Sequence, residues 1–275
     1  MIWKKCCLWL CGLLVGSHLF ALSEAATAAN TGANSAANTV ASAAANTQQR
    51  ILFVVSNQRF YGNSTLPASI SFGEVVHAWD IFSSAGYPVD FVSPAGGAVP
   101  IDPGMLGPKL TARLQDQRIM AGLQQTKTPA QIDASQYSAV YYVGGSNAMY
   151  QVPENKALQN IARHIYEKNR GVIAAVCHGT AGIVWITLSD GANLLAGKRV
   201  TGYPEEYEEP SEAYFQHLPF PMRKTIEAQG GLFKAPDPEQ PYIEVDGRLV
   251  TGQNYPSAPL VARAVVGLLQ QMPAK

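Results

Sequence analysis

Residues 171–183 read GVIAAVCHGTAGI, and this stretch indicates both the fold class and the place to look for chemistry. Its first half is a continuous run of β-branched and small apolar residues, which is typical of a strand buried on both faces. Cys177 and His178 follow directly, and the small residues after them favour a helix packed closely on that strand. A turn this tight strains the backbone of its apex residue and exposes that side chain above the sheet.

An alternation of strands and helices extends outward from this stretch. The sequence predicts strands at 51–56, 88–94, 138–145, 171–176, 198–203 and 249–252, and helices at 74–85, 109–124, 156–168, 178–188 and 258–271. Such an alternation predicts an α/β fold with a parallel sheet sandwiched by helices. Ligands of these sheets bind beyond the carboxyl ends of the strands, where Cys177 falls. Residues 204–246, rich in Glu, Pro and aromatic residues, are predicted to form an irregular lid insertion.

The first 49 residues differ in character from the rest. Residues 1–25 place Lys4 and Lys5 before an apolar run that ends in small residues, which is the layout of a secretory signal. An uncleaved anchor and a lipoprotein are the alternatives. Residues 26–49 are rich in Ala, Asn, Thr and Ser without charge, which predicts a flexible linker. We therefore expect an exported protein, periplasmic or secreted, with a folded domain at 50–275 and no stable membrane insertion after cleavage.

Composition excludes several classes of function. The chain has 275 residues, with 20 Lys and Arg against 20 Asp and Glu, so it lacks the positive charge that sequence-independent nucleic-acid binding needs. No phosphate-binding loop or dinucleotide fingerprint is present. Glu74 and His77 share one helix side, but no second pair completes a zinc-type ligand set. We therefore expect no cofactor, no metal and no nucleic-acid partner.

Cys177 is the candidate nucleophile. Three of the 4 cysteines lie in the predicted signal, so a mature chain keeps this one thiol. The start of a helix would stabilise its thiolate, whereas a buried structural cysteine is the alternative. His178 is expected to face the same cleft as its base. The partner of His178 is predicted to be a carboxylate after the next strand, where spacing does not choose among Glu205, Glu206, Glu208 and Glu209.

Two further positions have both a chemical and a plain structural explanation. Gly144 and Gly145 end the strand at 138–145, and glycine there lets backbone N–H groups form an oxyanion hole. An ordinary turn explains them equally well. Glu74 begins the helix at 74–85, and its local sequence favours a carboxylate that complements the helix dipole.

Together, these segments resemble the ThiJ/PfpI superfamily. The resemblance is carried by AAVCHG at 174–179, SAVYYVGG at 138–145, RVTGYPEEYEE at 199–209 and DGRLVTGQN at 246–254. Residues 73–103 and 246–258 are similar to the branch of heat-shock chaperones and glyoxalase III enzymes. The resemblance implies a flavodoxin-like, class I glutamine amidotransferase-like fold over nearly all of residues 50–271.

The resemblance also implies a role for each site residue. Cys177 matches the nucleophile, His178 its histidine and Glu208 the acidic third member. Glu74 matches a buried acid that hydrogen-bonds the thiol, in place of the dipole partner that its local sequence favours. Gly145 and the backbone N–H of His178 match the oxyanion hole.

The predicted substrate pocket departs from that branch. Its Gly-Gly-His-Gly segment is Gly144-Gly145-Ser146-Asn147 here, so Ser146 and Asn147 take the place of a pocket-lining imidazole. The proline that usually follows Cys-His-Gly is Thr180. These changes affect the pocket and leave the catalytic residues in place.

The expected function is that of a cofactor-independent cysteine enzyme acting on small reactive carbonyls. The resemblance implies glutathione-independent conversion of methylglyoxal to D-lactate, a lyase of the D-lactate dehydratase type, or deglycase-like hydrolysis. A holdase chaperone is the alternative. A glutaminase or peptidase is disfavoured, because His217 is the only histidine beyond His178 and no acid stands two residues after it. The expected partners are a small carbonyl substrate, a second copy of the chain and, for the chaperone alternative, unfolded client proteins.

Overall fold

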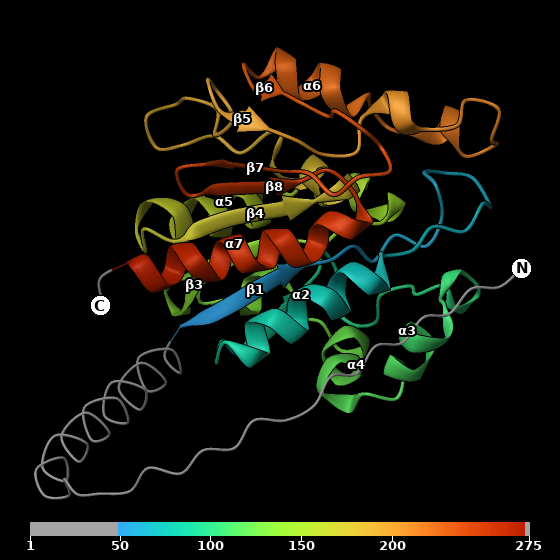
Figure 1. The fold of residues 1–275 in the computed structure, drawn as a ribbon, viewed down its shortest axis with the longest axis horizontal. Coiled ribbons are helices and arrows are strands. Elements are labelled where there is room, and N and C mark those ends of the chain that lie inside the picture. The colour runs from blue at the N-terminus through green and yellow to red at the C-terminus, as the bar shows by residue number, and fades with distance from the viewer. Residues whose placement is uncertain (1–48, 273–275) are drawn as a thin grey trace, which may run out of the picture. The chain divides into compact units, whose positions relative to one another are not determined.

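The computed structural model describes residues 49–272 (Figure 1). The predicted signal at 1–25, and all but the last residue of the predicted linker at 26–49, lie outside the described residues. Within residues 49–272, no helix is both long and apolar enough to span a bilayer.

A six-stranded sheet forms the centre of this domain, in the order β2-β1-β3-β4-β8-β7. Its neighbouring strands are parallel, except that β7 runs antiparallel to β8 at the edge. The predicted parallel sheet is therefore confirmed, with one antiparallel edge strand. The bounds are β1 Arg50–Val54, β2 Val89–Val92, β3 Tyr137–Tyr142, β4 Val172–Val176, β7 Ile243–Asp246 and β8 Leu249–Gly252.

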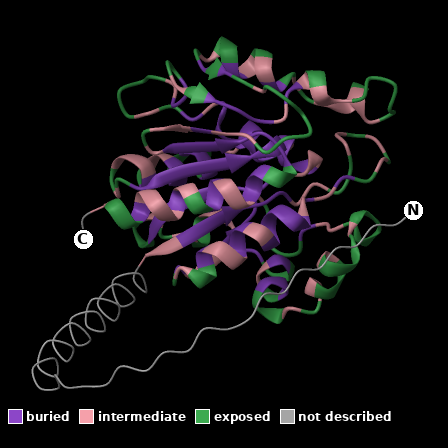
Figure 2. Ribbon diagram, in the orientation of Figure 1, coloured by how far each residue is buried: buried purple, intermediate pink, exposed green. Residues whose placement is uncertain are grey.

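Helices cover both faces of the sheet, as Figure 1 shows. Helices α2 (Phe72–Ser84) and α7 (Ala258–Gln271) lie on one face, and α5 (Lys156–Glu167) lies on the other. Successive strand residues point to opposite faces, so Phe53 joins the core under α2 and α7, whereas Leu52 joins the core under α5. Figure 2 shows the strands as buried throughout their central parts. Burial on both faces explains why these strands are continuous apolar runs.

Helix α2 follows its predicted pattern closely. Val75, Trp79 and Phe82 are all buried, as their helical spacing indicates. The helix ends at Ser84, and Gly86 then adopts a φ of 84°, the left-handed conformation that favours glycine after a helix.

Three predicted elements differ in the structure. The helix expected at 109–124 is two helices, α3 (Pro108–Arg113) and α4 (Gln117–Gln124). Asp116 separates them, because its side chain accepts the Arg118 N–H and caps a new helix start. The helix expected at 178–188 is a shorter 3-10 helix, Cys177–Ile183, that begins at the cysteine itself.

The strand expected at 198–203 also lies elsewhere. Only β5 (Arg199–Val200) is extended, and it pairs with β6 (Leu232–Phe233) in a separate two-stranded sheet. The position beside β4 is taken by β8. Residues 204–246 are more regular than predicted, because they contain α6 (Met222–Ala228), β6 and β7.

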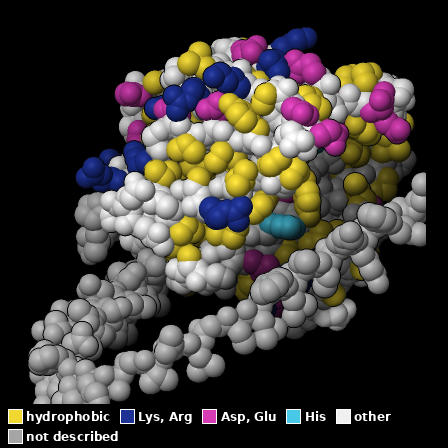
Figure 3. Space-filling view, viewed as in Figure 1, with side chains coloured by type: hydrophobic (Ala, Val, Ile, Leu, Met, Phe, Trp, Pro, Cys, Tyr) yellow, Lys and Arg dark blue, Asp and Glu magenta, His cyan; other side chains and the backbone are white. Residues whose placement is uncertain are grey.

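Exposed side chains are unevenly distributed on the face that carries α2 and α7. Lys, Arg, Asp and Glu are most numerous over the β5–α6 region, and hydrophobic side chains are exposed across the middle of the view (Figure 3).

Candidate active site

The cysteine stands on a strained turn at the carboxyl end of β4. Cys177 has a φ of 55°, one of three non-glycine residues with positive φ in the part of the chain that is described. The strained apex that the sequence predicts is therefore confirmed. Gly179 allows the close approach, since a Cβ there would lie 2.4 Å from the Tyr142 carbonyl oxygen. Only a short 3-10 helix follows, so its dipole stabilises a thiolate less than the expected helix would.

A single imidazole connects the thiol to a carboxylate. The Cys177 Sγ lies 3.5 Å from His178 Nδ1, and His178 Nε2 lies 2.7 Å from Glu208 Oε1. Because an ionised carboxylate only accepts hydrogen bonds, Glu208 fixes the imidazole proton on Nε2. Nδ1 is then free to accept the thiol proton. This arrangement has the geometry of a nucleophile, a base and an orienting acid.

The structure separates the four carboxylates that spacing leaves open. Glu208 alone contacts the imidazole, and its side chain is only 5% exposed. Glu205 accepts the backbone N–H of Arg223 at the start of α6. Glu206 forms an ion pair with the Arg223 side chain at 2.9 Å. Glu209 binds the hydroxyl of a neighbouring serine at the surface.

Glu74 is fully buried beside the cysteine. Its Oε2 accepts the Gly144 N–H at 2.7 Å. A Cβ at position 144 would lie 2.5 Å from that oxygen and 2.9 Å from the Cys177 Cβ, so glycine provides the space in which the two side chains meet. Burial raises the pKa of Glu74 to about 8, against the opposing hydrogen bonds of Gly144, Cys177 and Ser71. The carboxyl group therefore keeps its proton at neutral pH.

The same burial acts on the thiol. Burial raises the pKa of Cys177 well above its usual value, negative charge on Glu74 raises it further, and the His178 backbone N–H lowers it. A protonated Glu74 removes the second of these effects. The expectation of a thiolate preformed by a helix dipole is thus corrected. The contact that the thiol makes with His178 Nδ1 offers it a proton acceptor instead.

Gly145 is the residue whose N–H is predicted to be an oxyanion donor. It lines the cleft with a φ of 99°, and a Cβ there would lie 2.4 Å from both the Ser69 carbonyl oxygen and the Ser71 nitrogen. Among residues 49–272, no acceptor is found for the Gly145 N–H. The His178 N–H points at the thiol sulfur. Both residues line the cleft that contains the sulfur, and their role as an oxyanion hole stays a prediction.

Most of the predicted site residues line one cleft, with a volume of about 1440 Å³. Asn147 does not. Its side chain is fully buried and donates to the carbonyl oxygens of Ser56 at 3.2 Å and Gln58 at 3.1 Å. The prediction that it lines the substrate pocket is wrong, because its amide holds the loop after β1 instead. The cleft does contain Glu74, Gly145, Ser146, Cys177, His178 and Glu208.

The site also contains three tyrosines that the sequence does not identify as site residues. The Tyr203 ring lies 4.7 Å from the His178 ring. Tyr214 donates its hydroxyl to Glu208 Oε2 at 3.0 Å, and its ring stacks on Tyr61 at 5.1 Å. Tyr61 comes from the loop after β1 and Tyr214 from the insertion, so the contact joins two distant segments. No local pattern distinguishes such residues from ordinary aromatic residues.

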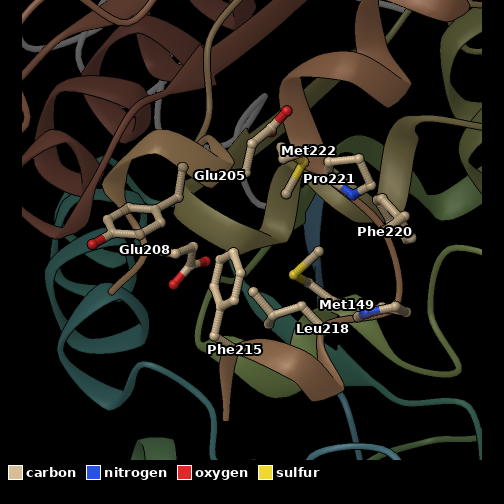
Figure 4. A pocket seen from close by; sticks show the side chains of 10 residues that line it. Met149, Glu205, Glu208, Phe215, Leu218, Phe220, Pro221 and Met222 are labelled. Atoms are coloured by element: carbon tan, nitrogen blue, oxygen red, sulfur yellow. The ribbon is translucent and has the colours of Figure 1, made fainter. Parts of the chain in front are cut away.

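A second, smaller pocket adjoins the cleft behind Glu208. It has a volume of about 260 Å³ and shares Tyr203 and Glu208 with the cleft. Figure 4 shows Phe215, Leu218 and Met149 directed toward its centre, with Glu208 at the edge. Its lining is therefore mainly apolar and comes largely from the 204–246 insertion.

The described residues give less support to a metal site or to a glutaminase. No group of three His, Cys, Asp or Glu side chains is arranged to hold a metal ion within residues 49–272. His217, the one later histidine, does not line the cleft.

Comparison with known proteins gives a consistent result. The sequence profile of the DJ-1/PfpI family matches residues 69–268. A glutathione-independent glyoxalase of Saccharomyces cerevisiae is 32% identical over 67% of this chain and 82% of its own length. A glutathione-independent glyoxalase of Schizosaccharomyces pombe is 27% identical over 82% of this chain and 98% of its own. The crystal structure of glyoxalase III from Candida albicans superposes with a TM-score of 0.71 at 22% identity, covering 80% of this chain and 97% of that one.

Proposed function

Because the chain belongs to the DJ-1/PfpI family, we propose that it is a glutathione-independent glyoxalase that converts methylglyoxal to D-lactate at Cys177. The observation that carries the proposal is the line of contacts from the thiol through His178 to Glu208, in one cleft with Glu74 and Gly145. The names of its relatives support the same activity. No cofactor is required for this chemistry, because the aldehyde carbon of the substrate is oxidised while its ketone carbon is reduced.

The first step is addition. His178 Nδ1 takes the thiol proton, and the sulfur of Cys177 forms a bond to the aldehyde carbon. The aldehyde oxygen becomes an oxyanion, for which the Gly145 N–H is an available donor. A protonated Glu74 donates a hydrogen bond beside the sulfur. The protonated His178 then returns this proton to the oxyanion, so the product is a hemithioacetal with no atom lost, and Nδ1 is again free to act as a base.

The second step moves one proton and then adds water. His178 removes the hydrogen from the former aldehyde carbon and returns a proton to the ketone carbon, which gives a lactoyl thioester. Water then attacks the thioester carbon, the carbon–sulfur bond breaks, and lactate leaves with the thiol restored. General acid–base catalysis of this type contributes about 10²–10⁴-fold to the rate. The net reaction consumes one methylglyoxal and one water.

The carboxylate substitution tests this proposal with a matched control. Glu208→Gln should lower kcat/KM for D-lactate formation from methylglyoxal by about 10²-fold or more, because it removes the charge that supports the imidazolium. Glu209→Gln makes the same change one residue later, at the surface, and should leave the rate within about twofold. Equal activity of the two variants would reject Glu208 as the acid that supports His178. Absence of D-lactate with the unmodified protein would reject the activity.

A holdase function is the second candidate, because Phe60, Met105 and Tyr255 expose large apolar side chains at the mouth of the cleft. It predicts that a Cys177→Ala variant still suppresses the aggregation of unfolded client proteins. Deglycase-type hydrolysis at the same cysteine is the enzymatic alternative. Assembly as a homodimer stays a prediction.

We also propose export, on the layout of residues 1–25 alone. The mature chain would then act outside the cytoplasm. Cell fractionation with the chain expressed in full, compared with a variant in which Lys4 and Lys5 are glutamates, tests this proposal. Equal amounts of both forms in the exported fraction would contradict it.

A further inference from the structure

The cleft is larger than methylglyoxal requires. Its volume is about 1440 Å³. A water molecule has a share of about 30 Å³ in the liquid, so a molecule with five non-hydrogen atoms occupies on the order of 150 Å³. Methylglyoxal would therefore fill roughly a tenth of the space, and it would leave most of the cleft wall in contact with water.

That wall is apolar and partly exposed. Residues 100–110 contribute Ile101, Leu106 and Leu110, which are half-buried against the core and line the cleft. At the rim of the cleft, Phe60 is 44% exposed and Met105 is 80% exposed. Tyr255 is 42% exposed, and its hydroxyl lies 3.0 Å from His77 Nε2.

The distribution of exposed apolar side chains is uneven. Among the described residues, four large hydrophobic side chains are exposed, and three of them line this one cleft: Phe60, Met105 and Tyr255. The fourth, Leu232, lies outside it. Exposed apolar side chains that cluster around a cavity indicate a ligand-binding groove, whereas scattered ones have no such meaning.

Charge at the rim is mixed. Arg59 and Lys109 line the cleft and have no ion-pair partner within residues 49–272, while Asp102 lines it as well. The part of the wall formed by Ile101, Leu106 and Leu110 carries no charge, so it fits an apolar chain. The reacting end of the ligand must be narrow, because Cys177 is only 8% exposed on the cleft floor.

We propose that this cleft selects 2-oxoaldehydes that carry an apolar chain of several carbons over methylglyoxal. The aldehyde carbon meets Cys177, and the chain packs on the wall that Phe60 and Met105 extend to the surface. The inference rests on the proposed function and uses the same reaction. Sulfur bonds to the aldehyde carbon, one hydrogen passes to the ketone carbon, and water displaces sulfur to release a 2-hydroxy acid.

A homologous series of substrates tests the inference with little change in carbonyl chemistry. The purified protein is assayed with methylglyoxal, 2-oxopentanal and 2-oxoheptanal, and release of the corresponding 2-hydroxy acid is measured. Each buried CH₂ should raise kcat/KM by about twofold to fourfold, the upper value corresponding to complete removal from water. The rise should be steepest in 1/KM, because the chain contributes binding.

Two surface variants then locate the binding wall. Phe60→Ser combined with Met105→Ser should flatten the dependence on chain length, measured within that variant as the ratio of kcat/KM for 2-oxoheptanal to kcat/KM for methylglyoxal. Leu232→Ser removes an exposed apolar side chain away from the cleft, and should keep the full dependence.

The outcomes are distinct. A kcat/KM that does not rise with chain length, or that rises equally in the rim variant, overturns this inference while the proposed glyoxalase activity stands. Failure to form a 2-hydroxy acid from any of the three substrates overturns the proposed function itself. If the rim variant loses only suppression of client aggregation, the rim binds unfolded protein, and the inference is again overturned.

Discussion

At the residue scale, His178 is held at both ring nitrogens, by the thiol on one side and by Glu208 on the other. The sequence predicted Cys177 and His178, because a strand-to-helix turn has a recognisable local pattern. Spacing does not distinguish Glu208 from the three neighbouring glutamates, because its position depends on how the insertion folds. Only the family resemblance indicates it. The error at Asn147 has a different origin, because adjacent residues on a turn can face opposite sides.

Tyr214 is predicted to position the carboxylate. Tyr214→Phe keeps the ring that stacks on Tyr61 but removes the hydrogen bond to Glu208 Oε2. We expect kcat/KM for methylglyoxal to fall by roughly 3- to 30-fold, the range for one hydrogen bond to a charged group acting indirectly. The melting temperature should change by less than a few degrees.

Tyr207→Phe is the control for this change. It lies in the same loop, and its hydroxyl contacts Gln253 at 3.5 Å rather than the triad. Equal kinetic losses in the two variants would show that Tyr214 acts through general loop stability and not through Glu208.

At the element scale, the strained turn at Cys177 depends on how closely the 3-10 helix Cys177–Ile183 packs on β3. Continuous apolar runs predict the central strands and helical spacing predicts α2, because those patterns are local. They did not predict β7 as an antiparallel edge or the pairing of β5 with β6, because both depend on segments far apart in the sequence. The break at Asp116 was visible in principle, as a capping residue inside an apolar pattern.

Two glycine substitutions test that packing. Gly179→Ala places a methyl group 2.4 Å from the Tyr142 carbonyl oxygen, and should lower the free energy of unfolding by about 1–3 kcal/mol. Gly267→Ala lies in α7 with no atom within 4 Å of the new methyl, and should raise it by about 0.5–1 kcal/mol. Urea denaturation measures both. A neutral or stabilising effect at position 179 would contradict the close packing described here.

At the scale of the whole molecule, the parallel sheet brings the site together. The strands β1, β3 and β4 end at the same edge, so the loops after them deliver Tyr61, Gly145 and Cys177 to one cleft. Glu74 enters from α2 and Glu208 from the insertion. Enclosing a carboxyl group in this way makes the stability of the domain depend on pH.

The direction of that dependence follows from Glu74. Its pKa is about 8 in the folded chain against 4.5 for the free group, so the folded state binds more protons between these values. Stability is therefore greatest below about pH 4.5 for this group and falls as pH rises toward 8, by up to roughly 1.4 kcal/mol per pH unit. Glu74→Gln does not titrate and should lack this loss.

The comparison is cleanest with Cys177 already replaced by Ala, so that no thiol titrates nearby. Unfolding free energies of Cys177→Ala, with and without Glu74→Gln, are measured from pH 5 to pH 8. The difference between the two proteins should grow steadily in favour of the Gln variant. A difference that stays constant across this range would mean that Glu74 is ionised throughout.

The most direct measurement is the rate of D-lactate formation from methylglyoxal, without glutathione, by the unmodified protein and by Cys177→Ala. We predict steady turnover by the first and a loss of at least about 10³-fold in kcat/KM in the second, because the carbon–sulfur bond cannot form. Circular dichroism should show the same fold for both. Turnover that persists in a folded Cys177→Ala variant would contradict the account, because the reaction would then proceed without the sulfur.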